Sequence, residues 1–156
     1  MKNILTVLAF AFFPVLAATA DAGDKKTDTF WSYDIFELIQ QVETGGEPNG
    51  GRGAVGDGGK SIGPYQIGLM YHTDAQERNR DLDNWKSCLE SYEYSERVIH
   101  TYMLRYAKSE WSRALKGEAT LKDLEKIARI HNGGPRGYKK SATDLYWSKV
   151  LRILSK

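Results

Sequence analysis

Cysteine is almost absent from this sequence, because Cys88 is the only one among its 156 residues. A single cysteine cannot form an internal disulfide, and it excludes a zinc site built from cysteines. The fold must therefore depend on its apolar core, which a chain of this length can form. Cys88 follows Trp85 and precedes Leu89, so we expect a buried apolar side chain rather than a nucleophile.

Histidine and net charge are also scarce. The three histidines, His72, His100 and His131, lie 28 and 31 residues apart. This is not the spacing of metal ligands, and we expect neither a metal nor a cofactor. Lys and Arg together number 22 and Asp and Glu 20, which leaves a formal charge of +2. That excess is too small to predict a nucleic-acid partner. It is compatible with an anionic polymer such as a bacterial wall but does not select one.

Long apolar runs are missing except at the N-terminus. Lys2 is followed by a largely apolar run, Ile4–Ala18, and then by Ala20-Asp21-Ala22, the pattern of a secretory signal peptide with its cleavage site. We predict a signal peptide over residues 1–22, with a short membrane anchor as the alternative. A polar, flexible segment follows over 23–30. The mature protein should be exported, either secreted or periplasmic, and have no membrane contact.

The remaining residues, 31–156, are predicted to form one domain. Apolar residues recur at helical spacing in four segments, near residues 31–44, 87–107, 121–132 and 141–154. A short helical piece is expected over 65–71. Thr120 and Asp123 have the spacing of a capping box, and Ser141 and Asp144 are expected to cap the last helix.

Glycine is concentrated rather than scarce, with 13 of the 15 glycines in residues 45–68 and 133–137. Asn49-Gly50 and Asp57-Gly58 are turn signals. They predict a loop or short hairpin near residues 47–62. The expected fold class is therefore α+β, mainly helical, with one small glycine-rich excursion. Gly59-Lys60-Ser61 resembles the end of a phosphate-binding loop, but Ala54 stands where that motif requires glycine, and we reject it.

Two carboxylates have contrasting surroundings. Glu43 ends an apolar helix beside Val42, and a glutamate with apolar neighbours loses hydration, which favours its protonated form. Asp57 lies in the glycine-rich loop, where it should stay ionised. Cleavage of a glycosidic bond needs a carboxyl that donates a proton and a second carboxylate that stabilises or captures the cationic sugar. The alternative is a solvated helix-end carboxylate and a plain turn residue.

Polar side chains in two further motifs are candidates for binding a sugar. Ser61, Tyr65 and Gln66 belong to the stretch SIGPYQI, and His131 and Asn132 end a predicted helix at Gly133-Gly134-Pro135. Tyr65 can offer a flat ring and Gln66 an amide. Two structural alternatives remain: Tyr65 in the core, and His131 as a satisfied structural histidine.

Several motifs together resemble the invertebrate-type (i-type) lysozymes, also called the destabilase family. The similarity runs from about residue 35 to residue 151. The motifs that carry it are VETG at 42–45, SIGPYQI at 61–67, ARIHNGGP at 128–135, GYKKS at 137–141 and YWSKV at 146–150. ARIHNGGP with its basic tail is the most specific of these.

The resemblance implies a lysozyme-like fold and hydrolysis of the β-1,4 link of peptidoglycan. Glu43 matches the family's general acid, and Asp57 matches its nucleophile or stabiliser. A proteinaceous lysozyme inhibitor is a further expected partner. Two alternatives stay open: a lytic transglycosylase that uses Glu43 alone, and a wall-binding protein without catalysis.

The sequence departs from its relatives in two respects. Relatives are typically rich in cysteine, which this chain is not. Some relatives also cleave isopeptide bonds with a serine near this loop and a lysine after the SIGPYQI motif. Ser61 is present, but Gly68 stands at the position of the lysine, so we expect no isopeptidase activity.

Overall fold

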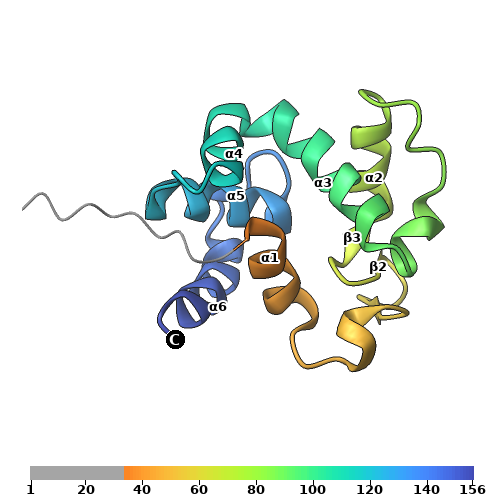
Figure 1. Cartoon of the computed structure of the whole chain (residues 1–156), viewed down its shortest axis with the longest axis horizontal. Coiled ribbons are helices and arrows are strands. Elements are labelled where there is room, and N and C mark those ends of the chain that lie inside the picture. Colours follow the sequence, from red (N-terminus) through yellow and green to blue (C-terminus); the bar gives the residue numbers. More distant parts are fainter. Residues whose placement is uncertain (1–33) are drawn as a thin grey trace, which may run out of the picture.

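The computed structural model describes residues 34–156, and over that range the chain is mainly helical (Figure 1). The predicted signal peptide, residues 1–22, and the segment 23–30 lie outside the described residues. Residues 34–156 form six α-helices: α1 (Ile35–Thr44), α2 (Leu69–Gln76), α3 (Tyr92–Tyr106), α4 (Lys108–Leu115), α5 (Leu121–Gly133) and α6 (Asp144–Leu154).

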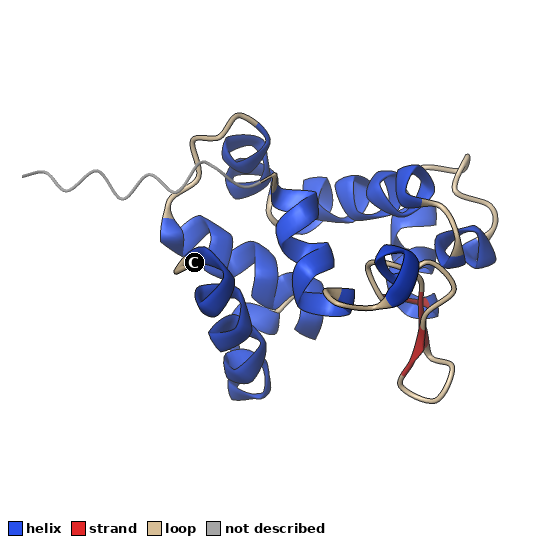
Figure 2. Cartoon of the chain, turned by 60° about the horizontal axis from the view of Figure 1, so that its bottom comes forward, coloured by secondary structure: helices blue, strands red, loops and turns tan. Residues whose placement is uncertain are grey.

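A small antiparallel sheet accompanies the helices. Its strands, each two residues long, are β1 (Val55–Gly56), β2 (Ser61–Ile62) and β3 (Ile67–Gly68), paired in the order β1-β2-β3. Figure 2 shows them at one end of the molecule, at the base of a protruding loop. The expected fold class, mainly helical with a glycine-rich excursion near residues 47–62, is confirmed.

The elements form two groups. α1, α4, α5 and α6 pack together, while α2, the sheet and the short 3-10 helix η2 (Trp85–Leu89) form the second group. α3 contacts both α2 and α4 and so joins them (Figure 1). The periodic apolar residues face the resulting core. Among those almost without solvent contact are Leu38, Ile39, Met103, Trp111 and Ile127.

The helices α1 and α5 form where the sequence predicted them. α1 begins after Asp34, whose side chain accepts a hydrogen bond of 2.8 Å from the Phe36 amide. The capping box before α5 is confirmed, since Thr120 and Asp123 each satisfy the other's backbone amide. Gly134 ends α5 with a φ of 81°, a conformation that favours glycine.

The predicted helix over 87–107 is divided in the structure. η2 covers Trp85–Leu89, and α3 begins only at Tyr92. The cause is Ser91, whose side chain accepts a hydrogen bond of 3.1 Å from the Tyr94 amide and so starts a new helix. The helical piece expected over 65–71 is also wrong, because β3 occupies residues 67–68 and α2 begins at Leu69.

The start of the last helix differs too. Ser141 does not cap α6, because a 3-10 helix, η4 (Ser141–Thr143), precedes it. No side chain caps α6 at its N-terminus. The hydroxyl of Thr143 instead donates 2.9 Å to the Gly137 carbonyl, which ties this turn to the preceding loop. α4 was not predicted.

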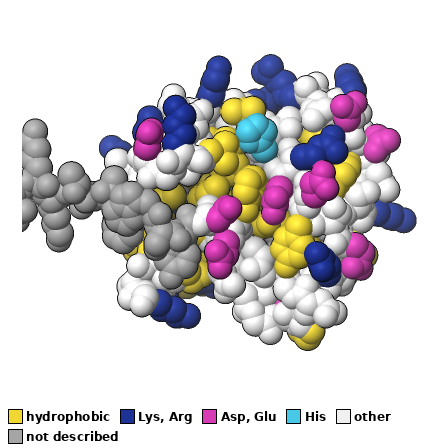
Figure 3. All heavy atoms as spheres, viewed as in Figure 1, with side chains coloured by type: hydrophobic (Ala, Val, Ile, Leu, Met, Phe, Trp, Pro, Cys, Tyr) yellow, Lys and Arg dark blue, Asp and Glu magenta, His cyan; other side chains and the backbone are white. Residues whose placement is uncertain are grey.

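Charged side chains of both signs lie on the face drawn in Figure 3. On this face, acidic side chains lie mainly near the middle and basic side chains mainly around the edge. Across residues 34–156, no helix has both the length and the apolar character needed to cross a bilayer. Cys88 is fully buried, as expected, and burial raises the pKa of its thiol to about 11.

Candidate functional site

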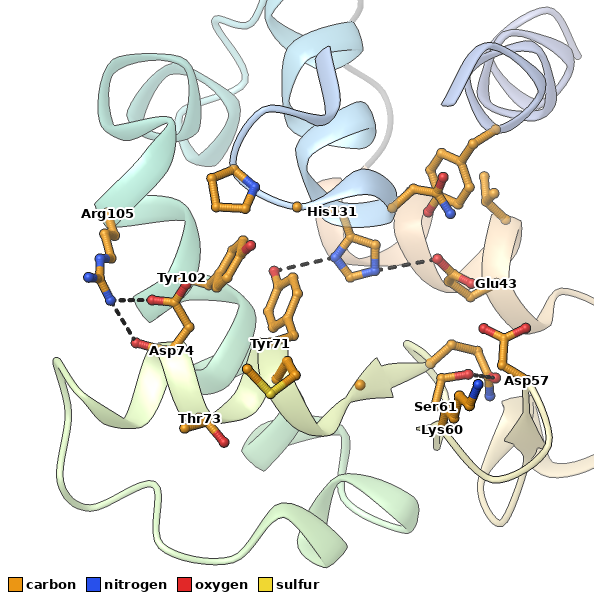
Figure 4. A pocket seen from close by; sticks show the side chains of 18 of the residues that line it. Glu43, Asp57, Lys60, Ser61, Tyr71, Thr73, Asp74, Tyr102, Arg105 and His131 are labelled. Carbon is orange, nitrogen blue, oxygen red and sulfur yellow. Dashed lines mark hydrogen bonds and ion pairs between the residues drawn. The ribbon is translucent and has the colours of Figure 1, made fainter. Parts of the chain in front are cut away.

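A cleft of about 770 Å³ opens between the two groups of elements. Residues of α1, α2, α3, α5, α6 and the β1–β2 turn line it. Figure 4 shows Glu43 and Asp57 at one end, Asp74 and Arg105 at the other, and His131 and Tyr71 between them.

Glu43 enters the cleft from the last turn of α1. The end of this helix is fixed to its neighbours: the Thr44 hydroxyl donates 2.7 Å to the Pro64 carbonyl, and the Gln40 amide donates 3.1 Å to the Gly50 carbonyl. The Glu43 side chain is 16% exposed. Its carboxyl group is therefore held in place and largely removed from bulk water while still lining the cleft.

Asp57 lies in the turn between β1 and β2, and it is exposed. Its backbone adopts a φ of 48°, which aspartate tolerates better than most residues. Close packing fixes the base of this turn. A Cβ on Gly56 would lie only 2.0 Å from Oε1 of Gln66, so a larger residue here would displace the Gln66 amide.

Ser61 and Gln66 line the cleft and also brace the hairpin that carries Asp57. The Ser61 hydroxyl donates 2.9 Å to Oε1 of Gln66, and Nε2 of Gln66 donates 2.9 Å to the Gly63 carbonyl. Gly63 in turn abuts η2. With a φ of 75°, its Cβ would lie 1.7 Å from the Cys88 carbonyl oxygen. The hairpin therefore packs directly against η2.

His131 connects the two halves of the site. Its Nε2 lies 3.3 Å from the Tyr65 carbonyl oxygen and 3.4 Å from Oε1 of Glu43. A carbonyl oxygen only accepts, so we assign the hydrogen of the neutral ring to Nε2. Nδ1 lies 3.4 Å from the Tyr71 hydroxyl and accepts from it. Burial of that hydroxyl raises the pKa of Tyr71 well above its usual value, which keeps it a donor.

The other end of the cleft holds an ion-paired cluster. Arg105 pairs with Asp74, and its Nη1 lies 2.8 Å from Oε2 of Glu77. The Tyr106 hydroxyl donates 2.6 Å to Oδ2 of Asp74. The ring of Tyr102, which also lines the cleft, stacks on Tyr71 with centroids 3.7 Å apart. These groups satisfy one another, so they form a fixed wall.

Tyr146 contributes a buried hydroxyl near Glu43. The residue lies on α6, is 6% exposed and lines the cleft. Its hydroxyl has no hydrogen-bond partner among residues 34–156. Burial and then the neighbouring Glu43 carboxyl raise the pKa of Tyr146 well above its usual value. The Tyr146 hydroxyl therefore lies close to the Glu43 carboxyl.

Most of the residues singled out in the sequence do meet in this cleft. Those that line it are Glu43, Asp57, Ser61, Gln66, His131 and Asn132. Residues from four separate segments are brought together, which supports treating them as one site.

Tyr65 is the exception, and the expectation that it contacts a sugar is corrected here. Its ring is 2% exposed, and its hydroxyl donates 2.6 Å to Glu96 on α3, outside the cleft. Apolar packing explains this placement, because Phe36 and Tyr92 meet the ring edge-on. Tyr65 serves the site only through its carbonyl, which receives His131.

Several cleft residues were missed from the sequence: Tyr71, Asp74, Tyr102, Arg105 and Tyr146. Tyr102 and Tyr146 stand on helices whose apolar faces were recognised, so their rings looked like ordinary core. Tyr71 and Asp74 stand on α2, which was not predicted as such. A pairing such as Arg105 with Asp74 joins residues 31 apart and leaves no local signal. Within residues 34–156, no group of three or more His, Cys, Asp or Glu side chains is arranged to hold a metal ion.

Comparison with known proteins identifies the fold. The family model described as Destabilase matches residues 39–152. Invertebrate-type lysozyme 6 of Caenorhabditis elegans is 33% identical over 127 residues, covering 78% of this chain and 86% of the relative. The chain belongs to the Destabilase family of invertebrate-type lysozymes. It is accordingly an enzyme of the lysozyme class.

Solved structures agree with this assignment. The Tapes japonica lysozyme has a TM-score of 0.57 and 28% identity. The Meretrix lusoria lysozyme, in complex with PliI of Aeromonas hydrophila, has a TM-score of 0.56 and 31% identity. Each comparison covers 80% of this chain and 91% of the other. The family resemblance noted in the sequence is therefore confirmed.

Proposed function

We propose that this lysozyme hydrolyses the β-1,4 glycosidic link of peptidoglycan, with Glu43 as general acid and base and Asp57 as nucleophile or electrostatic stabiliser. The observation that carries the proposal is the pair of carboxyl groups in one cleft, one largely buried beside a histidine and one exposed on a turn. Figure 4 shows both groups pointing into the same part of the cleft. Such contrasting environments suit the two roles that glycoside hydrolysis needs.

The reaction follows from these positions. The Glu43 carboxyl gives its proton to the oxygen of the leaving sugar as the C–O bond breaks. Asp57 stabilises the positive charge that develops on the other sugar, or bonds to its anomeric carbon. Water then attacks that carbon, and the Glu43 carboxylate takes the proton that the water loses. Glu43 ends protonated and Asp57 ends as a free carboxylate, as at the start.

His131 is a positioning residue in this scheme. Its Nε2 lies 3.4 Å from Oε1 of Glu43, which leaves the second carboxyl oxygen to meet the glycosidic oxygen. Ser61, Gln66 and Asn132 line the same cleft and offer hydroxyl and amide groups to the sugar. This contact with substrate adds to the bracing of the hairpin by Ser61 and Gln66.

The test compares the wild type with Glu43→Gln on purified cell walls. The variant keeps the shape of the side chain, but its amide has no acidic proton to donate to the leaving oxygen. Its rate should therefore fall by about 1000-fold. Glu47→Gln is the matched control, since Glu47 is exposed and lies outside the cleft. It should lyse walls like the wild type. Full lysis by Glu43→Gln would exclude the mechanism.

A lytic transglycosylase remains the second candidate, because Asp57 is exposed. Mass spectrometry of the released fragments separates the two: hydrolysis adds one water, whereas transglycosylation leaves an anhydro sugar end. A protein that binds walls and releases neither product would be a binding module.

We also infer that residues 1–22 are a signal peptide that directs the export of the chain. The solved complex of the Meretrix lusoria lysozyme with PliI supports a proteinaceous inhibitor as a partner here too.

A further inference from the structure

A buried hydroxyl without a partner is unusual in a folded protein, because each unmade hydrogen bond of a buried polar group costs stability. Within residues 34–156, only Arg129 and Tyr146 carry such atoms in their side chains. Arg129 forms ion pairs with Glu125 and Asp144, so it is otherwise well satisfied. The hydroxyl of Tyr146 is the one that lines the cleft.

The position of Tyr146 relative to Glu43 suggests what this hydroxyl does. The rings of Tyr146 and His131 lie 6.5 Å apart, and His131 in turn contacts Glu43. His131 occupies Oε1 of Glu43 from α5, and Tyr146 approaches from α6. The buried Tyr146 hydroxyl therefore lies close to the Glu43 carboxyl, yet it forms no hydrogen bond among residues 34–156.

We propose that Tyr146 is a positioning residue that donates a hydrogen bond to the Glu43 carboxylate once Glu43 has passed its proton to the leaving sugar. A hydrogen bond to a charged acceptor is about twice as strong as one between neutral groups. Tyr146 therefore stabilises the state of Glu43 that exists in mid-reaction more than the resting state. This proposal rests on the proposed function, in which Glu43 is the acid.

Other charged and titratable groups line the same cleft as Glu43, and a substitution at Tyr146 leaves their side chains chemically unchanged. They are His131 from α5, Tyr71 from α2, Asp57 and Lys60 from the β1–β2 turn, and Lys149 from α6. A change of pH dependence in a Tyr146 variant therefore reports the missing hydroxyl.

The decisive experiment measures the pH profile of wall hydrolysis by Tyr146→Phe. Without the hydroxyl, the Glu43 carboxylate is less stable, so Glu43 should hold its proton to higher pH. The alkaline limb of the profile, where activity falls as Glu43 loses its proton, should move up by about one pH unit. The plateau of kcat should fall about tenfold, and KM should stay the same. A raised KM with an unmoved limb would show that Tyr146 binds substrate instead, and it would overturn the proposal.

A fluorinated tyrosine at position 146 provides the opposite change. Fluorine makes the phenol a stronger donor, so the alkaline limb should move down. Structural damage could not shift the limb in opposite directions in the two variants. If both variants keep the wild-type limb, Tyr146 has no part in positioning Glu43.

Unfolding temperatures of two variants separate a positioning role of Tyr146 from a purely structural one. At a pH below the Glu43 midpoint, where the carboxyl is protonated, Tyr146→Phe should unfold at the wild-type temperature or above, since the lost hydroxyl has no partner within residues 34–156. Tyr94→Phe is the matched control, because its hydroxyl contacts Nε2 of His72 at 3.0 Å and accepts from the Asn84 amide at 2.9 Å. This control should lower the unfolding temperature and leave the limb in place.

The carboxyl signal of labelled Glu43 in an NMR titration needs no substrate. The pH at the midpoint of this titration should be higher in Tyr146→Phe than in the wild type, even if walls are not cleaved. An inactive wild type would overturn the proposed function, whereas an unmoved midpoint would overturn only the part assigned to Tyr146.

Discussion

The two ends of the cleft both carry a carboxyl group on a helix, but the surroundings of the two groups differ. Asp74 pairs with Arg105 and accepts 2.6 Å from Tyr106. Glu43 has no Lys or Arg within ion-pairing distance in the described residues, where its one ion-pairing contact is with the ring of His131, at 3.4 Å. An arginine fixes a carboxylate as part of the scaffold, and Glu43 has no such partner. This difference supports the proposal that Glu43, rather than Asp74, is the reactive carboxyl.

The largest effect in testing this comparison is expected from Asp57→Asn, at the end of the cleft that holds Glu43. We expect kcat to fall about 100-fold, because a charge aimed at the developing cation is lost. Stability should not change, since asparagine suits the φ of 48° at this exposed turn. Turbidity assays and thermal unfolding measure the two effects. A rate near that of the wild type would favour the transglycosylase.

The capping box of α5 shows a scaffold carboxylate in its extreme form. Asp123 accepts 2.9 Å and 2.6 Å from the Arg113 guanidinium, and it also accepts from Thr120. The Arg113 hydrogen bonds are the main cause that lowers the pKa of Asp123 well below its usual range. The stability from this group is therefore present above the unfolded pKa, near 4. It is lost as pH falls through the folded value.

Asp123→Asn should remove that contribution. At neutral pH the free energy of unfolding should drop by about 2 kcal/mol, an amount kept small because Arg113 is 42% exposed. The drop should vanish in strong acid, where the wild type has lost the same bond. Urea unfolding at several pH values measures this. An equal cost at every pH would contradict the linkage.

The smallest effect is expected at the far end of the cleft. Asp74→Asn keeps the shape of the side chain but removes the charge that pairs with Arg105, so stability should fall by about 1 kcal/mol. Wall lysis should stay close to the wild-type rate. A loss of activity as large as that of Asp57→Asn, with stability intact, would break the comparison between the two ends.

The sequence predicted those parts of the fold that have a local cause. α1 and α5 have regular apolar faces and side chains that cap them, and both formed where expected. Ser141 showed the same spacing as a cap, yet the Thr143 hydroxyl donates to Gly137 and the turn became a 3-10 helix. That contact depends on how the loop packs. Local spacing cannot indicate it.

The same difference between local causes and long-range packing applies to the site. Glu43 and Asp57 could be proposed because each has a local environment that matches one role. Tyr65 could not be placed, since a tyrosine beside Gln66 fits a sugar platform and a core equally well. Tyr146 was missed because its importance comes from a neighbour more than 100 positions earlier in the chain. Only the packing of α6 near α1 shows it.

The close contact between Gly63 and the Cys88 carbonyl limits how this enzyme can be altered. One added methyl group would lie 1.7 Å from that oxygen and force the hairpin away from η2. Asp57 would move with the hairpin although nothing in the catalytic cleft had been touched. In a library of random variants, Gly63 should therefore tolerate substitution as poorly as Glu43.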